Sequence, residues 1–134
     1  RAATYSAHTN TESSMTDTTL IKKHPDMRHE PLENCHDGEG ALDWKEVLAP
    51  DNLKDRHLNF VHDDVLAPGV SIGIHSHKDD EEYYYILAGA GTMSLDGEDC
   101  RVAAGDITAV YPGGEHGLLN DGDQDLRVLV FSIS

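Results

Sequence analysis

From residue 56 onward, apolar positions come in short runs that are separated by glycine, proline and aspartate. The runs are rich in Val, Ile, Leu, Tyr and Phe, and their spacing is typical of a sandwich or barrel of β-strands. No stretch after Asp55 has a helical period of useful length. The pattern therefore indicates an all-β fold. We predict strands over residues 56–66, 70–76, 82–88, 90–95, 98–103, 107–111, 115–120 and 126–133.

The first part of the chain has a weaker pattern. Residues 1–19 are dominated by Thr, Ser, Ala and Asn, which is typical of a weakly ordered tail, whether native or added to the chain. A first ordered element is expected near Leu20. Residues 41–48 begin with an apolar–polar alternation, which we interpret as a strand rather than one helical turn. At this length we expect a single domain over 20–134, with its core barrel over about 56–134.

The strongest compositional signal is charge. The chain has 25 acidic and 10 basic residues, which gives a formal net charge of -15 at pH 7. A surface this negative repels phosphate backbones and anionic lipid, so we expect neither nucleic acid nor a membrane as a partner. Acidic clusters occur at Asp63-Asp64, at Asp79-Asp80 and over 121–125. They could be calcium sites, but we favour a solvated acidic surface.

Targeting signals and cysteine pairs are not apparent. The sequence has no signal-peptide pattern and no apolar run of about 18 residues, so we expect a cytoplasmic protein without a membrane span. Cys35 and Cys100 lie far apart and form no Cys-x-x-Cys motif. We therefore predict free thiols rather than a disulfide.

The candidate chemistry lies in residues 69–89. His75 lies at the end of the strand predicted over 70–76, and His77 follows two residues later. With strand geometry, both imidazoles can point to the same face, about 6 to 7 Å apart along the strand. A polar loop follows, and Glu82 begins the next predicted strand. The stretch thus offers three potential metal ligands, and a further histidine, His116, follows in residues 105–120.

These two stretches resemble the two motifs of the cupin superfamily, strongly over 56–134 and loosely over 20–55. One position departs from the family pattern, because Tyr111 stands where cupins usually have proline and Pro112 comes one place later. His116 nevertheless keeps its spacing to the residues around it. The nine positions that match are Gly69, His75, His77, Glu82, Gly89, Gly105, Gly113, His116 and Asn120.

The resemblance implies a small jelly-roll β-barrel with a metal inside it. His75, His77, His116 and Glu82 offer three imidazole nitrogens and one carboxylate, a set that suits one divalent Mn, Fe, Ni, Cu, Co or Zn ion. Calcium and magnesium prefer oxygen ligands and are disfavoured. Four protein ligands on an ion that accepts six leave two positions for water, dioxygen or a chelating substrate. The alternative is that these residues only fill a polar interior or hold a structural metal.

Other residues near the motifs are also candidate site residues. Ser71 and Gly73 share the face of His75 if the strand is regular, and Tyr84 and Ile86 share the face of Glu82. Tyr84 is the candidate catalytic residue, because its hydroxyl could donate a hydrogen bond or a proton to a substrate. Plain strand packing is the alternative, which we favour for Tyr83, Tyr85 and Tyr111. We interpret His57 and His62 as surface or core residues, Asn120 as a turn residue, and His8, His24, His29 and His36 as non-functional.

Two classes of function are consistent with these residues. We expect a metal-dependent enzyme, a dioxygenase, an isomerase or epimerase, or a lyase, acting on a small oxygenated molecule that chelates the metal. The alternative is a non-catalytic module that binds or senses a small molecule or sugar. By analogy with small cupins we also expect a homodimer, formed through the 20–55 segment, which offers Leu32, Leu42, Trp44, Val47 and Leu48.

Overall fold

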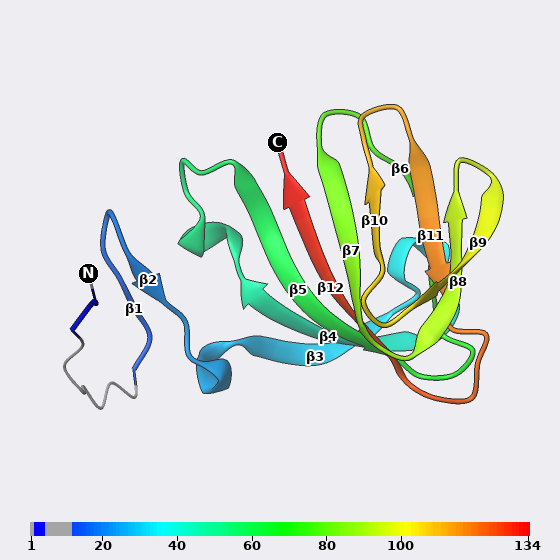
Figure 1. Ribbon diagram of the computed structural model, residues 1–134, viewed down its shortest axis with the longest axis horizontal. Helices are drawn as coiled ribbons and strands as arrows, with labels where there is room; N and C mark the ends of the chain where they lie inside the picture. Colours follow the sequence, from blue (N-terminus) through cyan, green and yellow to red (C-terminus); the bar gives the residue numbers. More distant parts are fainter. Residues whose placement is uncertain (1, 5–11) are drawn as a thin grey trace.

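Two antiparallel β-sheets make up most of the molecule in the computed structural model, which describes residues 2–4 and 12–134 (Figure 1). The larger sheet has the order β10-β7-β12-β5-β4-β3 and the smaller sheet the order β6-β11-β8-β9. The strands of the larger sheet are β3 (Arg28–Glu33), β4 (Ala41–Leu48), β5 (Leu58–Leu66), β7 (Glu81–Ala88), β10 (Ile107–Val110) and β12 (Leu126–Ile133). Those of the smaller sheet are β6 (Ser71–Ser76), β8 (Ala90–Leu95), β9 (Glu98–Ala103) and β11 (Glu115–Leu119).

This architecture confirms the predicted all-β jelly-roll. Each strand predicted after residue 56 is present with ends that differ by at most two residues, and the strand predicted over 41–48 is β4. The buried apolar cluster draws on both sheets. Among the described strands the two sheets pack together without joining into one closed barrel. None of the described helices is long and apolar enough to cross a membrane.

The amino-terminal part contains elements that the pattern did not predict. Strand β3 has no apolar alternation because all six of its residues are exposed, and Pro31 is tolerated since β3 is an edge strand. The pattern also did not predict β1 (Ser14–Met15), which forms a two-residue ladder with β2 (Leu20–Ile21). Strand β2 confirms the first ordered element that was expected near Leu20. Much of the predicted tail, residues 1 and 5–11, lies outside the described residues. The short 3-10 helices are η1 (His24–Asp26), η2 (Cys35–Asp37) and η3 (Pro50–Asn52).

The inner face of the larger sheet is organised in rows across its central strand, β12. Small or medium side chains of β12, two valines and a serine, are buried between larger side chains of β5 and β7. Directly opposed residues of an antiparallel sheet share a face, so each row points into the interior. The rows are Asp64–Val128–Ile86, His62–Val130–Tyr84 and Phe60–Ser132–Glu82.

Residues 34–40, which include η2, lie against the edge strand β6. The two segments meet at two glycines: a Cβ on Gly38 would overlap the carbonyl oxygen of Ser71, and a Cβ on Gly73 would overlap that of His36. Ser71 and Glu39 join the segments by hydrogen bonds in both directions. Glycine is therefore required at both positions for this close approach, which brings His36 beside β6.

Asp64 is a buried acid and corrects the prediction that its cluster is solvated. Its side chain is 3% exposed and accepts one hydrogen bond, from the backbone N–H of Lys45 at 3.3 Å. Burial, together with the negative charges of Asp63, Asp43 and Glu82, raises the pKa of Asp64 to about 7. The folded protein therefore favours the protonated carboxyl.

Asp64→Asn should make folding less dependent on pH. The pKa of Asp64 is about 7 in the folded protein, against an ordinary value of 3.8. Its contribution to stability is therefore fully present below pH 3.8 and is lost as the pH rises through about 7. The neutral amide avoids that loss. In metal-free protein, the free energy of unfolding of the variant relative to wild type should rise by roughly 2 kcal/mol between pH 5 and pH 8.

Denaturant unfolding at the two pH values measures this difference. Asp99→Asn on the exposed strand β9 serves as the control and should show no such change. Equal pH dependence in wild type and Asp64→Asn would contradict the account of this buried acid.

Candidate metal centre

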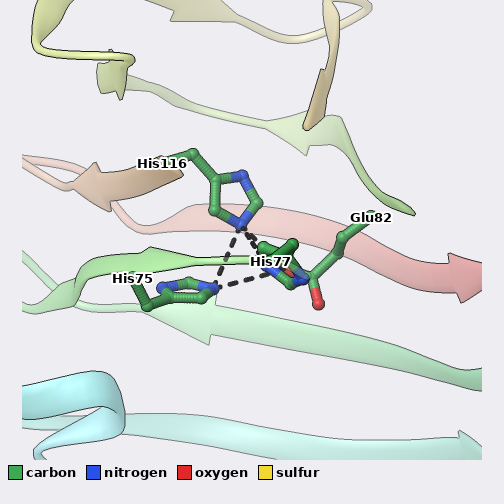
Figure 2. A group of neighbouring side chains, drawn as sticks. All are labelled: His75, His77, Glu82 and His116. Atoms are coloured by element: carbon green, nitrogen blue, oxygen red, sulfur yellow. Dashed lines mark hydrogen bonds and ion pairs between the residues drawn. The ribbon is translucent and has the colours of Figure 1, made fainter. Parts of the chain in front are cut away.

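The structure brings together all four predicted metal ligands. His75 comes from β6, His77 from the loop that follows it, Glu82 from β7 and His116 from β11 (Figure 2). One donor atom from each residue lies within 4.8 Å of the donor atoms of the other three. His77, Glu82 and His116 are buried, and His75 is half-buried. The cluster therefore has the composition and the spacing of a site that could hold a metal ion.

A one-residue bulge aims two of these histidines inward. His75 pairs with His116, while the next inward pair is Ile72 with Leu118, so β6 has one residue more than β11 between the two pairs. Bulges of this kind turn a side chain without ending the sheet. Gly117 lies at the bulge, where an added Cβ would come within 3.0 Å of the backbone of Ile72.

Because of the bulge, one prediction that assumed strict alternation along the strand is wrong. Ser71 was expected on the face of His75, but it pairs with Leu119, which is 40% exposed, and Ile72 takes the core position. The corresponding expectation for β7 is confirmed, because Tyr84 and Ile86 are buried on the inner face together with Glu82.

The tautomers of two candidate ligands, His75 and His77, are fixed by the hydrogen bonds that their Nδ1 atoms make. Nδ1 of His75 lies 2.7 Å from the carbonyl oxygen of Gly73, and Nδ1 of His77 lies 3.0 Å from a carboxylate oxygen of Asp80. Both oxygens accept hydrogen bonds, so each Nδ1 carries the proton. In the neutral rings, Nε2 of His75 and Nε2 of His77 are therefore unprotonated, and each carries the lone pair that binding a metal requires.

His116 lies at the centre of the cluster. Its Nε2 is 3.1 Å from Nε2 of His75, 3.2 Å from Nε2 of His77 and 3.0 Å from a carboxylate oxygen of Glu82. Its buried Nδ1 has no hydrogen-bond partner among the described residues. Two donors that bind one ion at right angles, each about 2.1 Å from it, lie about 3.0 Å apart. The spacing therefore fits neighbouring positions around a single transition-metal ion.

The carboxylate of Glu82 provides the negative charge of the cluster. Burial opposes its ionisation, but the hydrogen bond with His116 and the nearby imidazole of His75 outweigh burial and lower the pKa of Glu82 to about 2. The pKa values of two imidazoles shift in opposite directions. Burial lowers the pKa of His116, whereas the carboxylate of Glu82, 3.7 Å away, and the hydrogen bond to Gly73 overcome burial and raise the pKa of His75.

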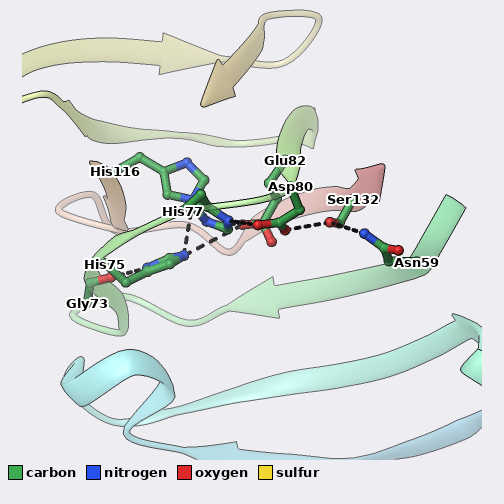
Figure 3. A network of polar contacts seen from close by, with 8 residues as sticks. All are labelled: Asn59, Gly73, His75, His77, Asp80, Glu82, His116 and Ser132. Atoms are coloured by element: carbon green, nitrogen blue, oxygen red, sulfur yellow. Dashed lines mark hydrogen bonds and ion pairs between the residues drawn. The ribbon is translucent and has the colours of Figure 1, made fainter. Parts of the chain in front are cut away.

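A chain of hydrogen bonds behind His77 holds its ring in place (Figure 3). The hydroxyl of Ser132 donates to the second carboxylate oxygen of Asp80 at 2.7 Å, and the amide of Asn59 donates to Ser132 at 3.0 Å. Asp80 was predicted to be part of a solvated acidic surface, and that prediction is wrong. No spacing rule in the sequence identifies Asp80 as the partner of His77, because the contact depends on how the loop folds.

Tyr84 lies directly beside the cluster. It is 2% exposed, and its ring centre is 4.7 Å from that of His116. Burial, and then the nearby charge of Glu82, raises the pKa of Tyr84 well above its ordinary value, so the hydroxyl keeps its proton at neutral pH. Tyr83, on the opposite face, stacks on Phe131 at 5.0 Å. A catalytic role for Tyr84 stays a prediction.

One histidine that we interpreted as non-functional contacts the cluster. The ring of His36 stacks on that of His75, with centres 3.6 Å apart and planes 9° apart. His36 has a left-handed backbone with a φ of 50°, which is uncommon outside glycine. The sequence contains no motif for this contact. His24 and His29 do not belong to the cluster, and His8 lies outside the described residues.

The remaining candidates have structural positions. Asn120 is fully buried and donates hydrogen bonds to the backbone of Leu66 and Gln124, so it holds the turn after His116 as predicted. His57 and Tyr111 are exposed, and His62 lies on the inner face of β5. Cys35 and Cys100 are unpaired, as predicted.

Comparisons with known proteins agree with this geometry. A protein of Thermotoga maritima named an oxalate-binding protein is 29% identical over 116 residues, which is 87% of this chain and 95% of that protein. The crystal structure of a predicted oxalate decarboxylase from Thermotoga maritima has a TM-score of 0.78 and 28% identity. It covers 84% of this chain and 97% of that chain.

Another solved structure is similar over a smaller share of each chain. The structure of a putative sugar phosphate isomerase from Acidithiobacillus ferrooxidans has a TM-score of 0.61 and 27% identity, and covers 70% of this chain and 60% of that one. Finally, the family model described as "Cupin domain" matches residues 63–132, which include all four clustered residues and more than half of the chain. The chain therefore belongs to the cupin family.

Proposed function

We propose that His75, His77, Glu82 and His116 bind one divalent transition metal, and that this metal binds a small dicarboxylate of the oxalate type. The observation that carries the proposal is the convergence of three imidazole Nε2 atoms and one carboxylate oxygen on one point. Two of those nitrogens present lone pairs by virtue of their outer hydrogen bonds. When bound, the metal would supply a Lewis acid that polarises the oxygens of the ligand.

The dicarboxylate is favoured by the donor set and by the relatives. Four protein donors on an ion that accepts six leave two positions, which suits chelation by two oxygens. The Thermotoga maritima protein that is similar over most of both chains is named for oxalate binding. A sugar phosphate is less well supported, since no lysine or arginine is buried among the described residues to receive a phosphate group.

Turnover of the bound ligand is the second candidate function, and Tyr84 is the observation in its favour. A lyase of this kind would break the bond between the two carbons of hydrogen oxalate, release carbon dioxide and leave the proton on the carbon of formate. The buried, protonated hydroxyl of Tyr84 beside Glu82 could hold the ligand through a hydrogen bond during that step. The dioxygenase and isomerase alternatives use the same ligand set.

Asp80→Asn should weaken metal binding by at least tenfold. The amide is a weaker acceptor for Nδ1–H of His77 and can also present its own N–H, so the ligand tautomer is less well fixed. Competition against a chromophoric chelator with Co(II) and Zn(II) measures the affinity. The neighbouring exposed Asp79→Asn is the matched control and should bind as wild type does. Equal affinities in both variants would contradict the role assigned to Asp80.

Metal-loaded protein should bind oxalate, and chelator-treated protein should not. Isothermal titration calorimetry measures the binding, and release of formate and carbon dioxide measures turnover. If turnover occurs, Tyr84→Phe should lower kcat by at least tenfold while the Kd for oxalate changes less. Binding without turnover would identify a binding protein, and absence of binding in the metal-loaded protein would contradict the proposed ligand.

We also propose that the protein forms a homodimer through its amino-terminal part. Leu42 was expected to contribute to that interface, but it is buried in the core. The β1–β2 ladder extends away from the two sheets (Figure 1). Residues 15–20 of this ladder and residues 51–58 line a hollow. Met15, Leu20 and Ile21 are 55%, 39% and 38% exposed, and the edge of β3 is free within the described residues. An exposed apolar arm and an open edge strand are features that a second copy can cover.

Analytical ultracentrifugation at micromolar concentration should give the mass of a dimer. Leu20→Glu together with Ile21→Glu should shift the equilibrium toward the monomer, because the charges oppose burial of the arm. Ala103→Glu together with Ala104→Glu, exposed positions at the end of β9 and away from this arm, serves as the control for added charge. A monomer in the wild type would contradict the proposed homodimer.

A further inference from the structure

His62 lies on the same interior face as the candidate metal centre. In the sheet, β5 and β7 flank β12, and Val130 pairs with both His62 and Tyr84. The backbones of neighbouring strands are about 4.8 Å apart, which places His62 and Tyr84 about 10 Å apart across Val130. The side chains at these two positions therefore lie on the same face of the sheet. Glu82 belongs to the adjacent row of the same face.

Trp44 fixes the tautomer of His62. Its indole nitrogen lies 3.2 Å from Nδ1 of His62. An indole N–H donates and does not accept, so Nδ1 is the acceptor and the proton of the neutral ring is on Nε2. The ring is also held from two sides, by stacking on Phe60 at 4.4 Å and by edge contact with Trp44 at 5.1 Å. His62 therefore presents an N–H group in a defined direction.

That N–H group has no hydrogen-bond partner among the described residues. Within residues 2–4 and 12–134, the only side-chain hydrogen bond of His62 is the one that it accepts from Trp44. Burial lowers the pKa of His62 to about 4, against the opposing charge of Glu82, so the ring is neutral at pH 7. His62 is still partly exposed. The interior thus contains a neutral, preorganised donor on the same side as the metal cluster.

We propose that His62 is a ligand-binding residue, whose Nε2–H donates to an acceptor oxygen of the small molecule that chelates the metal. Trp44 is its positioning residue. The inference rests on the proposed function and extends it, because it states how the part of the ligand that faces away from the metal is recognised. Oxalate fits this requirement, since two of its oxygens can chelate while the other two remain free to accept a hydrogen bond.

A neutral donor also selects among ligands. A molecule that ends in a carboxylate or carbonyl oxygen satisfies the N–H of His62, whereas one that ends in a methyl or an ammonium group leaves the donor unpaired, which is costly in a desolvated site. We therefore expect the site to prefer oxalate over ethylenediamine, which chelates a metal through two nitrogens and has no oxygen that could accept the hydrogen bond. The preference should depend on His62.

The test uses the metal-loaded protein, with oxalate as the probe. His62→Phe keeps an aromatic ring and removes the donor, and it should raise the Kd for oxalate by about tenfold to a hundredfold, as expected for a hydrogen bond to a charged group. The metal affinity should not change. His62→Gln restores a side-chain N–H and should recover part of the loss. His57→Gln, an exposed histidine near the start of the same strand, is the control.

Two further readouts separate recognition from packing. Long-range ¹⁵N–¹H correlation spectra of the wild type should show His62 protonated at Nε2, and Trp44→Phe should give a mixture of tautomers with weaker oxalate binding. A purely structural His62 would alter thermal stability in His62→Phe but leave the Kd for oxalate unchanged, which would overturn the inference alone. Failure of the wild type to bind oxalate would overturn the proposed ligand together with it.

Discussion

Two imidazole nitrogens and one carboxylate oxygen lie within hydrogen-bond distance of Nε2 of His116, an arrangement that suits a bound cation. Nδ1–H groups of His75 and His77 donate outward, which leaves their Nε2 lone pairs facing the centre. A single proton on His116 can satisfy only one of its three close neighbours. A divalent ion satisfies all of them at once. The cluster thus makes physical sense as a metal site and poor sense as a self-contained hydrogen-bond network.

The rest of the fold holds these donors at that spacing. The bulge between β6 and β11 turns His75 and His116 inward, and the Asp80–Ser132–Asn59 chain fixes His77. The same interior also carries groups whose charged forms are disfavoured by burial: the pKa of Asp64 is raised to about 7, so a substantial share of it is protonated near neutral pH, and His62 is neutral. Glu82 and Asp80 are the anionic exceptions, because each is paired with a histidine. Around the proposed metal, the negative charge is therefore confined to carboxylates that histidines hold.

Much of the fold and of the cluster could be predicted because the relevant signals are local. Period-two alternation and turn residues locate the strands from β4 to β12, and strand geometry accounts for the inward positions of His75 and Glu82, whereas His77 lies in the loop after β6. The features that were missed depend on tertiary contacts. His36 reaches His75 only because Gly38 and Gly73 allow two distant segments to touch. The predicted face of Ser71 was wrong because one bulge shifts the alternation, which composition does not show.

The most direct measurement is the metal content of protein purified without an affinity tag or chelator, by plasma mass spectrometry, for the wild type and for Glu82→Ala and His116→Ala. We predict close to one transition-metal ion per chain in the wild type and loss of that ion in both variants, with the β-rich circular dichroism retained. A wild type that contains no metal and takes none up on titration, or variants that keep full occupancy, would contradict the account.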